Sequence, residues 1–270
     1  MNDTQARPVK TTQTSIRIGR AIQRRDGATL TELSEALDLA KSTVHNHLAT
    51  LVEEGLLVEE GGQYYIGLRF LEFGEHARNR REHYTPAKLQ VYRLAESTNE
   101  EANFAVAENG YMYSLEYVMG DANPNNPAVG STFLSVGSKF RMHNSAPGKA
   151  VLSALPTHRV ESILDRRGLP ATTENTITDR ETLLEELETV REQGYATNDE
   201  ELEVGFRSIA APVTLDDGTV LGGLSIGGPA YRFELDDASG GRSVDTLRKA
   251  VADVEREIGR MANVDDDSKE

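Results

Sequence analysis

Residues 31–67, TELSEALDLAKSTVHNHLATLVEEGLLVEEGGQYYIG, decide the fold of the N-terminal part of the chain. Their start predicts a short amphipathic helix that Thr31 caps, and residues 38–40 interrupt it. Residues 41–54 predict a second helix, ended by Gly55, whose inward stripe is Val44, Leu48, Leu51 and Val52. A strand, a glycine-rich turn and a second strand follow. The stretch therefore predicts a helix-turn-helix with a two-stranded wing.

The outward face of the second helix suits contacts with DNA. Its side chains are short and polar, its N-terminus favours a phosphate, and Asn46 can pair with adenine in the major groove. A winged helix that binds a protein partner without specific DNA recognition is the alternative. The candidate DNA-contacting residues are Thr31, Lys41, Ser42, Thr43, His45, Asn46, His47 and Thr50.

Composition indicates a soluble chain with room for two domains. The 270 residues include no cysteine, which excludes disulfides and thiolate chemistry. No run of about 18 apolar residues and no apolar signal core occur, so we expect a cytoplasmic protein without membrane contact.

Charge is unevenly distributed along the chain. The net charge is −15, but residues 1–52 hold seven basic and five acidic groups, so the rest of the chain carries −17. Arginine outnumbers lysine by 22 to 7. An acidic surface over a nearly neutral N-terminal part resembles proteins from salt-loving organisms. At high salt, phosphate contacts would be screened, and base edges and DNA shape would carry more of the discrimination.

The whole pattern predicts an α+β fold class. We expect a winged helix-turn-helix domain at residues 10–67, a linker helix at 68–83, an α/β domain at 84–262 and a disordered acidic tail at 263–270. A first helix from Thr14 to Arg25 would contribute Ile16, Ala21 and Ile22 to the core. A turn-rich loop is expected at 121–127. The other expected elements are a helix near Pro86 with Leu89, Tyr92 and Leu94, strands at 102–107 and 111–118 joined at Asn109-Gly110, helices at 146–155 and 179–193, strands at 208–215 and 219–227, and a helix at 244–261.

Several segments, in a fixed order, carry a family resemblance. They are KSTVH at 41–45, YIGL at 65–68, HNSAPGKA at 143–150, REQGYA at 191–196, DEE at 199–201, GFRSIAAP at 205–212 and LSIGGP at 224–229. Their order and spacing over roughly residues 14–262 resemble the IclR family of bacterial and archaeal transcriptional regulators. Asn46 departs from the family pattern, which usually has arginine there.

The resemblance implies an effector-binding C-terminal domain similar to the GAF fold, and assembly as a homodimer or homotetramer. It implies a small organic acid or aromatic compound as effector, bound by residues that match Ala146, Pro147, Gly148, Asn198, Ser208, Ser225 and Gly227. Amide groups at a glycine-containing helix N-terminus attract a carboxylate, and serine hydroxyls can orient it. Pro147 and Gly227 lack the donors usual in the family. Ser208 and Ser225 could instead satisfy backbone groups of the sheet, and Gly227 a strand bulge.

Enzyme and metal chemistry are poorly supported. Residues 223–227, GLSIG, match the G-x-S-x-G pattern, but the serine lies in an apolar strand and no histidine follows His158, which leaves a Ser225 hydrolase as a weak alternative. Gly148-Lys149 lacks the remaining residues of a phosphate loop, and His45 and His47 diverge on a helix. We therefore expect no catalytic residue, metal or cofactor, and a regulator of catabolic genes whose affinity for double-stranded DNA responds to an effector.

Overall fold

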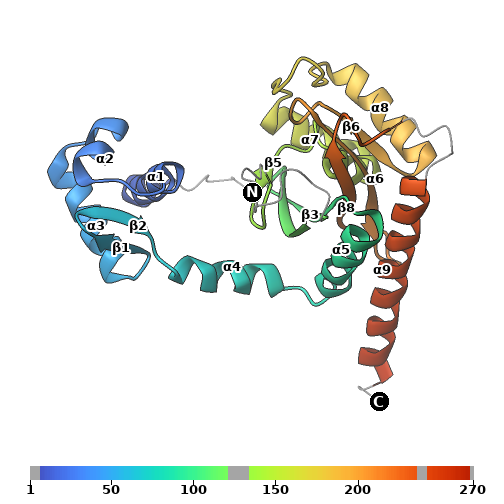
Figure 1. The fold of residues 1–270 in the computed structure, drawn as a ribbon, viewed down its shortest axis with the longest axis horizontal. Coiled ribbons are helices and arrows are strands. Elements are labelled where there is room, and N and C mark those ends of the chain that lie inside the picture. Colours follow the sequence, from blue (N-terminus) through green and yellow to red (C-terminus); the bar gives the residue numbers. More distant parts are fainter. Residues whose placement is uncertain (1–6, 121–133, 236–241, 268–270) are drawn as a thin grey trace. The chain divides into compact units, whose positions relative to one another are not determined.

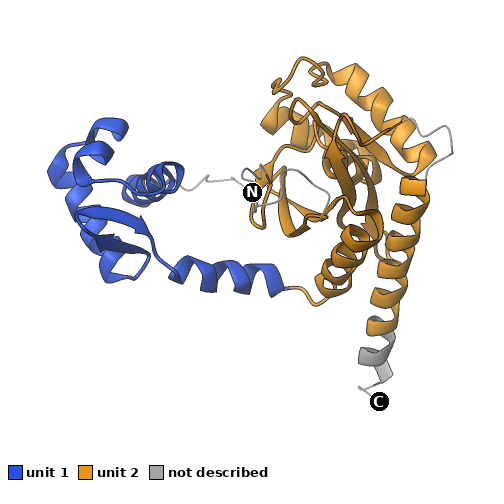
Figure 2. Ribbon diagram, viewed as in Figure 1, with its two compact units in different colours: residues 1–80 blue, residues 81–270 orange. Residues whose placement is uncertain are grey.

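The computed structural model describes residues 7–120, 134–235 and 242–267, with side chains as far as residue 261. The chain forms two compact units, residues 1–80 and residues 81–270 (Figure 2). Each unit has a hydrophobic core of its own. The predicted loop at 121–127 lies outside the described residues.

The first unit is a helix-turn-helix with a two-stranded wing and one further helix (Figure 1). Its elements are α1 (Lys10–Arg25), α2 (Leu30–Leu37), α3 (Lys41–Glu53), β1 (Leu57–Glu60), β2 (Gln63–Ile66) and α4 (Arg69–Asn79). Gly55 ends α3 at a φ of 69°, and the wing turns at Gly61 and Gly62 with φ of 59° and 82°. Positive φ at both turn residues matches the twist of an antiparallel hairpin. The core consists of Ile18, Ala21, Ile22, Ala28, Leu33, Val44, Leu48 and Leu57.

Three expectations for this unit were wrong. Helix α1 begins at Lys10 rather than Thr14, and Ile16 is 50% exposed. Ile18, Ala21 and Ile22 form its buried stripe, and Ile16, two residues before that stripe begins, lies on another face of the helix. The cap of α2 is Thr29, not Thr31.

Thr29 caps α2 through a reciprocal pair of hydrogen bonds with Glu32. The backbone N–H of Glu32 donates to Thr29 Oγ1 at 3.3 Å, and the backbone N–H of Thr29 donates to Glu32 Oε2 at 2.7 Å. This capping box satisfies two donors that the helix itself cannot. The T-x-x-E spacing of residues 29–32 was the signal that identifies it.

The second unit is a six-stranded antiparallel sheet with helices on both faces (Figure 1). The strand order is β5-β4-β3-β8-β7-β6. The strands are β3 (Glu101–Glu108), β4 (Tyr111–Val118), β5 (Lys139–Phe140), β6 (Ala196–Asp199), β7 (Phe206–Thr214) and β8 (Val220–Pro229). The helices are α5 (Tyr84–Thr98), α6 (Ala146–Ala154), α7 (Thr157–Arg167), α8 (Arg180–Gln193) and α9 (Arg242–Asp267). The predicted α+β fold class is confirmed.

Alternating residues of the strands build one core on each face of the sheet. Ala102, Phe104 and Ile226 pack with α5 and α9, whereas Ala105 packs with α6, α7 and α8. Leu89 and Tyr92, two of the residues named for the helix expected near Pro86, are 58% and 54% exposed. The buried stripe of α5 instead contains Ala87, Val91 and Leu94, which recur at helical spacing.

Three elements of this unit were not expected from the sequence. Strands β5 and β6 have only two and four residues, and α7 precedes the charged helix α8. Helix α9 also continues through Asp267 instead of ending at Met261, so part of the expected acidic tail is helical. Short edge strands carry too few residues to show a period of two.

Candidate functional site: nucleic-acid interface and ligand cavity

The N-terminus of α3 is suited to bind a phosphate. Ala40 precedes the helix and, in the described structure, no side chain caps its first-turn N–H groups. Those groups and the positive end of the helix dipole attract an anion. Lys41, Ser42 and Thr43 are exposed on this turn, and Asn46 is exposed on the next. Backbone and side-chain donors are therefore presented together on the exposed side of α3.

The remaining predicted DNA contacts differ in how available they are. His45 is exposed, whereas half-buried His47 places Nδ1 2.8 Å from Ser15 Oγ of α1 and so joins the two helices. Thr50 is exposed, but its hydroxyl donates to the backbone oxygen of Asn46 at 3.0 Å. Thr31 is exposed in the first turn of α2. Lys41, Ser42, Thr43, His45 and Asn46 are thus exposed side chains for which no internal role is seen among the described residues.

A row of mostly polar side chains crosses the second unit's sheet on the face toward α6. Asn103 of β3 pairs with Tyr117 of β4 and with Ser225 of β8, and Gly227 pairs with Glu101 and Ser208. Their strand neighbours Phe104 and Ile226 point into the opposite core. The row consists of Glu101, Asn103, Tyr117, Ser208, Ser225 and Gly227.

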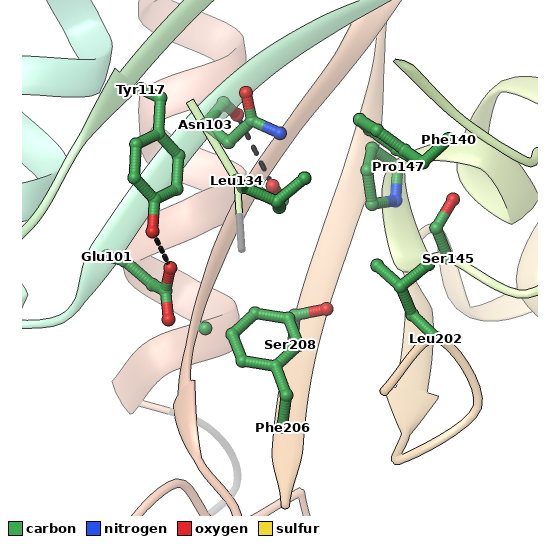
Figure 3. Close-up of a pocket in the computed structure, with 12 residues that line it drawn as sticks. Glu101, Asn103, Tyr117, Leu134, Phe140, Ser145, Pro147, Leu202, Phe206 and Ser208 are labelled. Carbon is green, nitrogen blue, oxygen red and sulfur yellow. Dashed lines mark hydrogen bonds between the residues drawn. The ribbon is translucent and has the colours of Figure 1, made fainter. Parts of the chain in front are cut away.

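This row is one wall of a small cavity (Figure 3). Phe206 and residues from α6, β5 and the neighbouring turns complete its lining, namely Leu134, Phe140, Ser145, Pro147 and Leu202. Tyr117 and Glu101 lie opposite Pro147 and Ser145 in Figure 3. Its volume of about 20 Å³ exceeds the roughly 10–15 Å³ that one water occupies. The cavity as it stands admits a group of about the size of water, and a larger ligand needs movement of its lining.

The start of α6 brings only one of its three predicted contacts to the cavity. Pro147 lines it, whereas Ala146 is fully buried against α8 and the sheet. The amide of Gly148 donates to the N-cap hydroxyl of Ser145 at 3.3 Å. A side chain on Gly148 would meet the backbone of Met142, with only 2.6 Å to its carbonyl carbon. Gly148 therefore allows a close backbone approach, and its N–H is already used.

Asn198 lies behind the cavity rather than in its lining. Its Oδ1 accepts hydrogen bonds from the backbone N–H groups of Glu201 and Leu202, both at 3.0 Å. Glu201 Oε1 in turn lies 2.6 Å from Lys149 Nζ, which also lies 2.9 Å from Glu186 Oε1. This buried network fixes the turn that carries Leu202. Pro147, Ser208, Ser225 and Gly227 are the predicted residues that the structure brings together.

The charged and aromatic residues of the cavity were not predicted. Glu101 is 5% exposed, and the Tyr117 hydroxyl donates to its Oε2. Burial, followed by the charge of Glu101, raises the pKa of Tyr117 far above its ordinary value, so this hydroxyl stays neutral and donating. A glutamate at a sheet-core position of β3 was the available signal, because buried carboxylates are rare without partners.

Ser225 has the surroundings of a strand residue. It lies within β8, and its hydroxyl donates to the backbone oxygen of Asn103 at 3.3 Å. The strand continues past residues 223–227, so the strand-turn-helix of a nucleophile elbow does not form here. Among the described residues, no three His, Cys, Asp or Glu side chains gather where a metal ion could bind. Nor does any described helix combine the length and apolarity needed to cross a bilayer.

Comparison with protein families matches both units. The "IclR helix-turn-helix domain" matches residues 16–61, and the "Bacterial transcriptional regulator IclR C-terminal" domain matches residues 77–256. A Halobacterium salinarum protein named "Probable HTH-type transcriptional regulator ArcR" is 32% identical over 241 residues, which cover 88% of this chain and 90% of the relative. The regulator KdgR of Dickeya chrysanthemi is 31% identical over 232 residues, 85% of this chain and 73% of its own.

Solved structures show the same fold over nearly the whole chain. The IclR protein of Thermotoga maritima superposes with a TM-score of 0.73 at 23% identity, covering 93% of this chain and 97% of that one. An IclR homolog from Microbacterium hydrocarbonoxydans, solved with 4-hydroxybenzoate, gives a TM-score of 0.72 at 22% identity, covering 93% and 99%. With both domain families matched in order, the chain belongs to the IclR family of DNA-binding transcriptional regulators.

Proposed function

We propose that this protein binds an operator through α3 and that a small metabolite in the second unit's cavity changes its affinity for that operator. The proposal of operator binding rests on the first turn of α3, which has no side-chain cap and exposes Lys41, Ser42 and Thr43. The proposal of an effector site rests on the polar row of the sheet, which lines a cavity. The regulated genes would be catabolic, and the protein would act in the cytoplasm, where its DNA lies.

In this proposal, α3 enters the major groove with two kinds of contact. Asn46 would bind a base edge, with Ser42 and Thr43 beside it, whereas Lys41 would bind a phosphate. The two classes differ in salt dependence, because only a phosphate contact releases counterions. The other predicted contacts, Thr31, His45, His47 and Thr50, would flank this centre.

The test separates the two classes of contact by titration with operator DNA at several salt concentrations. Asn46→Ala should weaken specific binding by about 1–3 kcal/mol and leave the salt slope unchanged. Lys41→Ala should weaken binding to all sequences and reduce the slope by about 1. Gln13→Ala, at an exposed site of α1, serves as the control. Equal operator binding by Ser42→Ala/Thr43→Ala/Asn46→Ala and the wild type would refute this role of α3, and salt-independent binding would favour the partner-binding alternative.

Assembly as a homodimer or homotetramer is supported by the surface of the first unit. Helix α4 has no buried residue, and Leu68, Leu71 and Phe73 are 86%, 62% and 52% exposed. Exposed apolar side chains in one short segment mark a surface that a second chain covers. A dimer would also present two α3 helices to a pseudo-palindromic operator. Sedimentation equilibrium of the wild type and Leu71→Glu/Phe73→Glu tests this, with a monomeric wild type as the refuting result.

The effector is expected to contact Pro147, Ser208, Ser225 and Gly227, which line the cavity. Ala146, Gly148 and Asn198 would then act indirectly, by holding α6 and the turn at Leu202. The family resemblance favours an organic acid or aromatic carboxylate, the class to which the ligand of the Microbacterium homolog belongs. A Ser225→Leu variant should bind operator but ignore the effector. Operator release by the effector in this variant would place the effector elsewhere.

The strongly negative net charge of the chain is typical of proteins that work at high salt concentration. The net charge of −15 and the excess of arginine over lysine accompany a 32% identical relative in Halobacterium salinarum. We propose that the protein works at high salt, where mutual repulsion of its acidic groups is screened. Operator contacts would then depend on base edges and DNA shape more than on phosphates.

A further inference from the structure

Three cationic side chains gather around the ring of Tyr111 at one edge of the second unit's sheet. Lys139 Nζ lies 3.6 Å from the centre of this ring. The guanidinium carbons of Arg167 and Arg141 lie 4.5 Å and 5.9 Å from the same centre. The four residues come from the start of β4, from β5 and the residue after it, and from the last turn of α7. We call them the Tyr111 cluster.

No carboxylate forms a salt bridge with these three cations in the part of the chain that the structure describes. Asp165, also on α7, pairs with Arg180 instead. Glu108 lies opposite Tyr111 in the register of the β3–β4 hairpin and is exposed, but it forms no salt bridge with the cluster. The ring of Tyr111 offsets part of the repulsion between the cations. In a chain with a net charge of −15, this cluster is therefore a local concentration of positive charge that an anion would stabilise.

Hydrogen bonds to backbone oxygens hold the two arginines of the cluster in place. Arg167 Nε donates to the backbone oxygen of Asn109 at 2.9 Å, and Arg167 Nη2 donates to the same oxygen. Arg141 Nη1 donates to the backbone oxygen of Arg167 at 3.1 Å. A guanidinium has five N–H groups, so both side chains keep further donors for a ligand. Because both arginines are half-buried and already oriented, little side-chain freedom would be lost on binding.

A small hollow beside the cluster is distinct from the cavity of the proposed effector. Its volume is about 10 Å³, and its lining includes Gly110, Arg141, His143, Arg167 and Gly168. This space is close to what one water needs, so it admits one oxygen of an oxyanion. Phe140 lines the effector cavity, whereas its chain neighbours Lys139 and Arg141 contact Tyr111. The Tyr111 cluster therefore offers a second place for a ligand.

We propose that the Tyr111 cluster binds a small phosphate monoester. A phosphate monoester carries about −1.5 to −2 charges at pH 7, which matches converging cations better than the single charge of a carboxylate does. Guanidinium groups bind phosphate oxygens in a bidentate geometry, and the ammonium of Lys139 adds a point charge. Duplex DNA fits less well, because a polyanion would be repelled by the net negative charge of the chain, whereas a small ligand meets mainly the cluster.

Calorimetric titration of the full-length protein with glycerol 3-phosphate tests this proposal, with its methyl diester and glycerol as probes of similar shape. The monoester should bind tightest, the diester more weakly because it carries one charge, and glycerol not at all. Lys139→Gln and Arg141→Gln should each weaken monoester binding by at least about tenfold, as the loss of a charge-assisted hydrogen bond does. Arg159→Gln, at an exposed site of the same helix as Arg167, should bind the monoester as the wild type does.

Arg167→Lys provides a further variant, which keeps the charge but loses the planar guanidinium, and it should also weaken monoester binding. Thermal unfolding of each variant separates binding from stability. If the cluster served only to pack Tyr111, Lys139→Gln would lower the Tm and leave monoester binding unchanged. That result, or no monoester binding by the wild type, would overturn the proposal. Weaker binding of every DNA sequence by Lys139→Gln, without monoester binding by the wild type, would overturn it as well and assign the cluster to DNA.

Discussion

Replacing Gly148 with alanine should destabilise the second unit, even though alanine is the better helix former. A Cβ at this position would lie 2.6 Å from the carbonyl carbon of Met142 and nearer still to its oxygen and Cα. Comfortable carbon contacts are about 3.5–4.0 Å, so the two backbones would have to separate by about 1 Å. Helix α6 cannot yield freely, because Pro147 packs closely against Gly223 of β8 on its other side.

The loss of stability on Gly148→Ala is the difference between two opposing contributions to the free energy of unfolding. Overpacking that shifts the backbone costs about 1–3 kcal/mol, and the upper end applies because both partners are main chain. Replacing glycine by alanine within a helix stabilises the folded state by about 0.5–1 kcal/mol. The net loss for Gly148→Ala is about 2 kcal/mol, which lowers the Tm of a unit of this size by about 4–8 °C. Gly259→Ala in α9 has open surroundings, with Asp216 Oδ2 at 3.6 Å, and should raise the Tm by about 2 °C.

Differential scanning calorimetry of the full-length protein measures both variants, with the transition of the second unit followed separately from that of the first. The comparison also distinguishes two roles for Gly148. If Gly148 served the effector only through its amide, alanine would preserve that donor and leave the unliganded protein as stable as the wild type. Equal Tm values for Gly148→Ala and the wild type would therefore refute the packing argument.

Three further predictions concern charge. Lys149→Met should cost about 3–5 kcal/mol in urea unfolding, because it leaves two carboxylates uncompensated, and adding Glu201→Gln should recover part of the loss; additive losses would refute the coupling. Desolvation raises the pKa of Glu201 above 4.5 despite the opposing charge of Lys149, so the folded state retains this proton longer than the unfolded state. Stability should fall as pH rises from about 4.5 through the raised pKa, a slope that Glu201→Gln removes and that an unchanged variant profile would contradict. Raising KCl should increase the Tm, because it screens a net charge of −15, and a flat salt response would argue against a salt-adapted surface.

Local sequence signals predicted the elements whose structure is set by neighbouring residues. The stripe of Val44 and Leu48 located α3, Gly55 ended it, and Asn109-Gly110 joined β3 to β4, because each signal depends on a few adjacent positions. Ser225 was correctly assigned to a strand for the same reason. The expectation for Ile16 was wrong because it depended on the phase of α1, and a small error in the assumed stripe moves a side chain to another face of the helix.

The cavity required information that no single segment contains. Glu101 and Tyr117 become neighbours through the register of β3 with β4, and Ser225 joins them through the register of β3 with β8. A one-residue change in either register would turn these side chains into the opposite core. Sequence resemblance identified Pro147, Ser208, Ser225 and Gly227 as candidates, and all four line the cavity. Glu101, the carboxylate in the same lining, lies outside the matching motifs.

The same registers determine which part of the cavity can respond to a ligand. The polar row belongs to paired strands, and α6 is held between Met142 and Gly223, so neither wall moves without breaking sheet pairing or close backbone packing. Leu202 and Phe206 are attached to the 200–206 turn instead. That turn is held by Asn198 and by the pairing of Glu201 with Lys149, and Glu201 Oε2 is buried without a partner in the described structure. If an effector occupies the cavity as proposed and displaces Leu202, it would strain this ion pair and so couple the cavity to the position of α8 through Glu186.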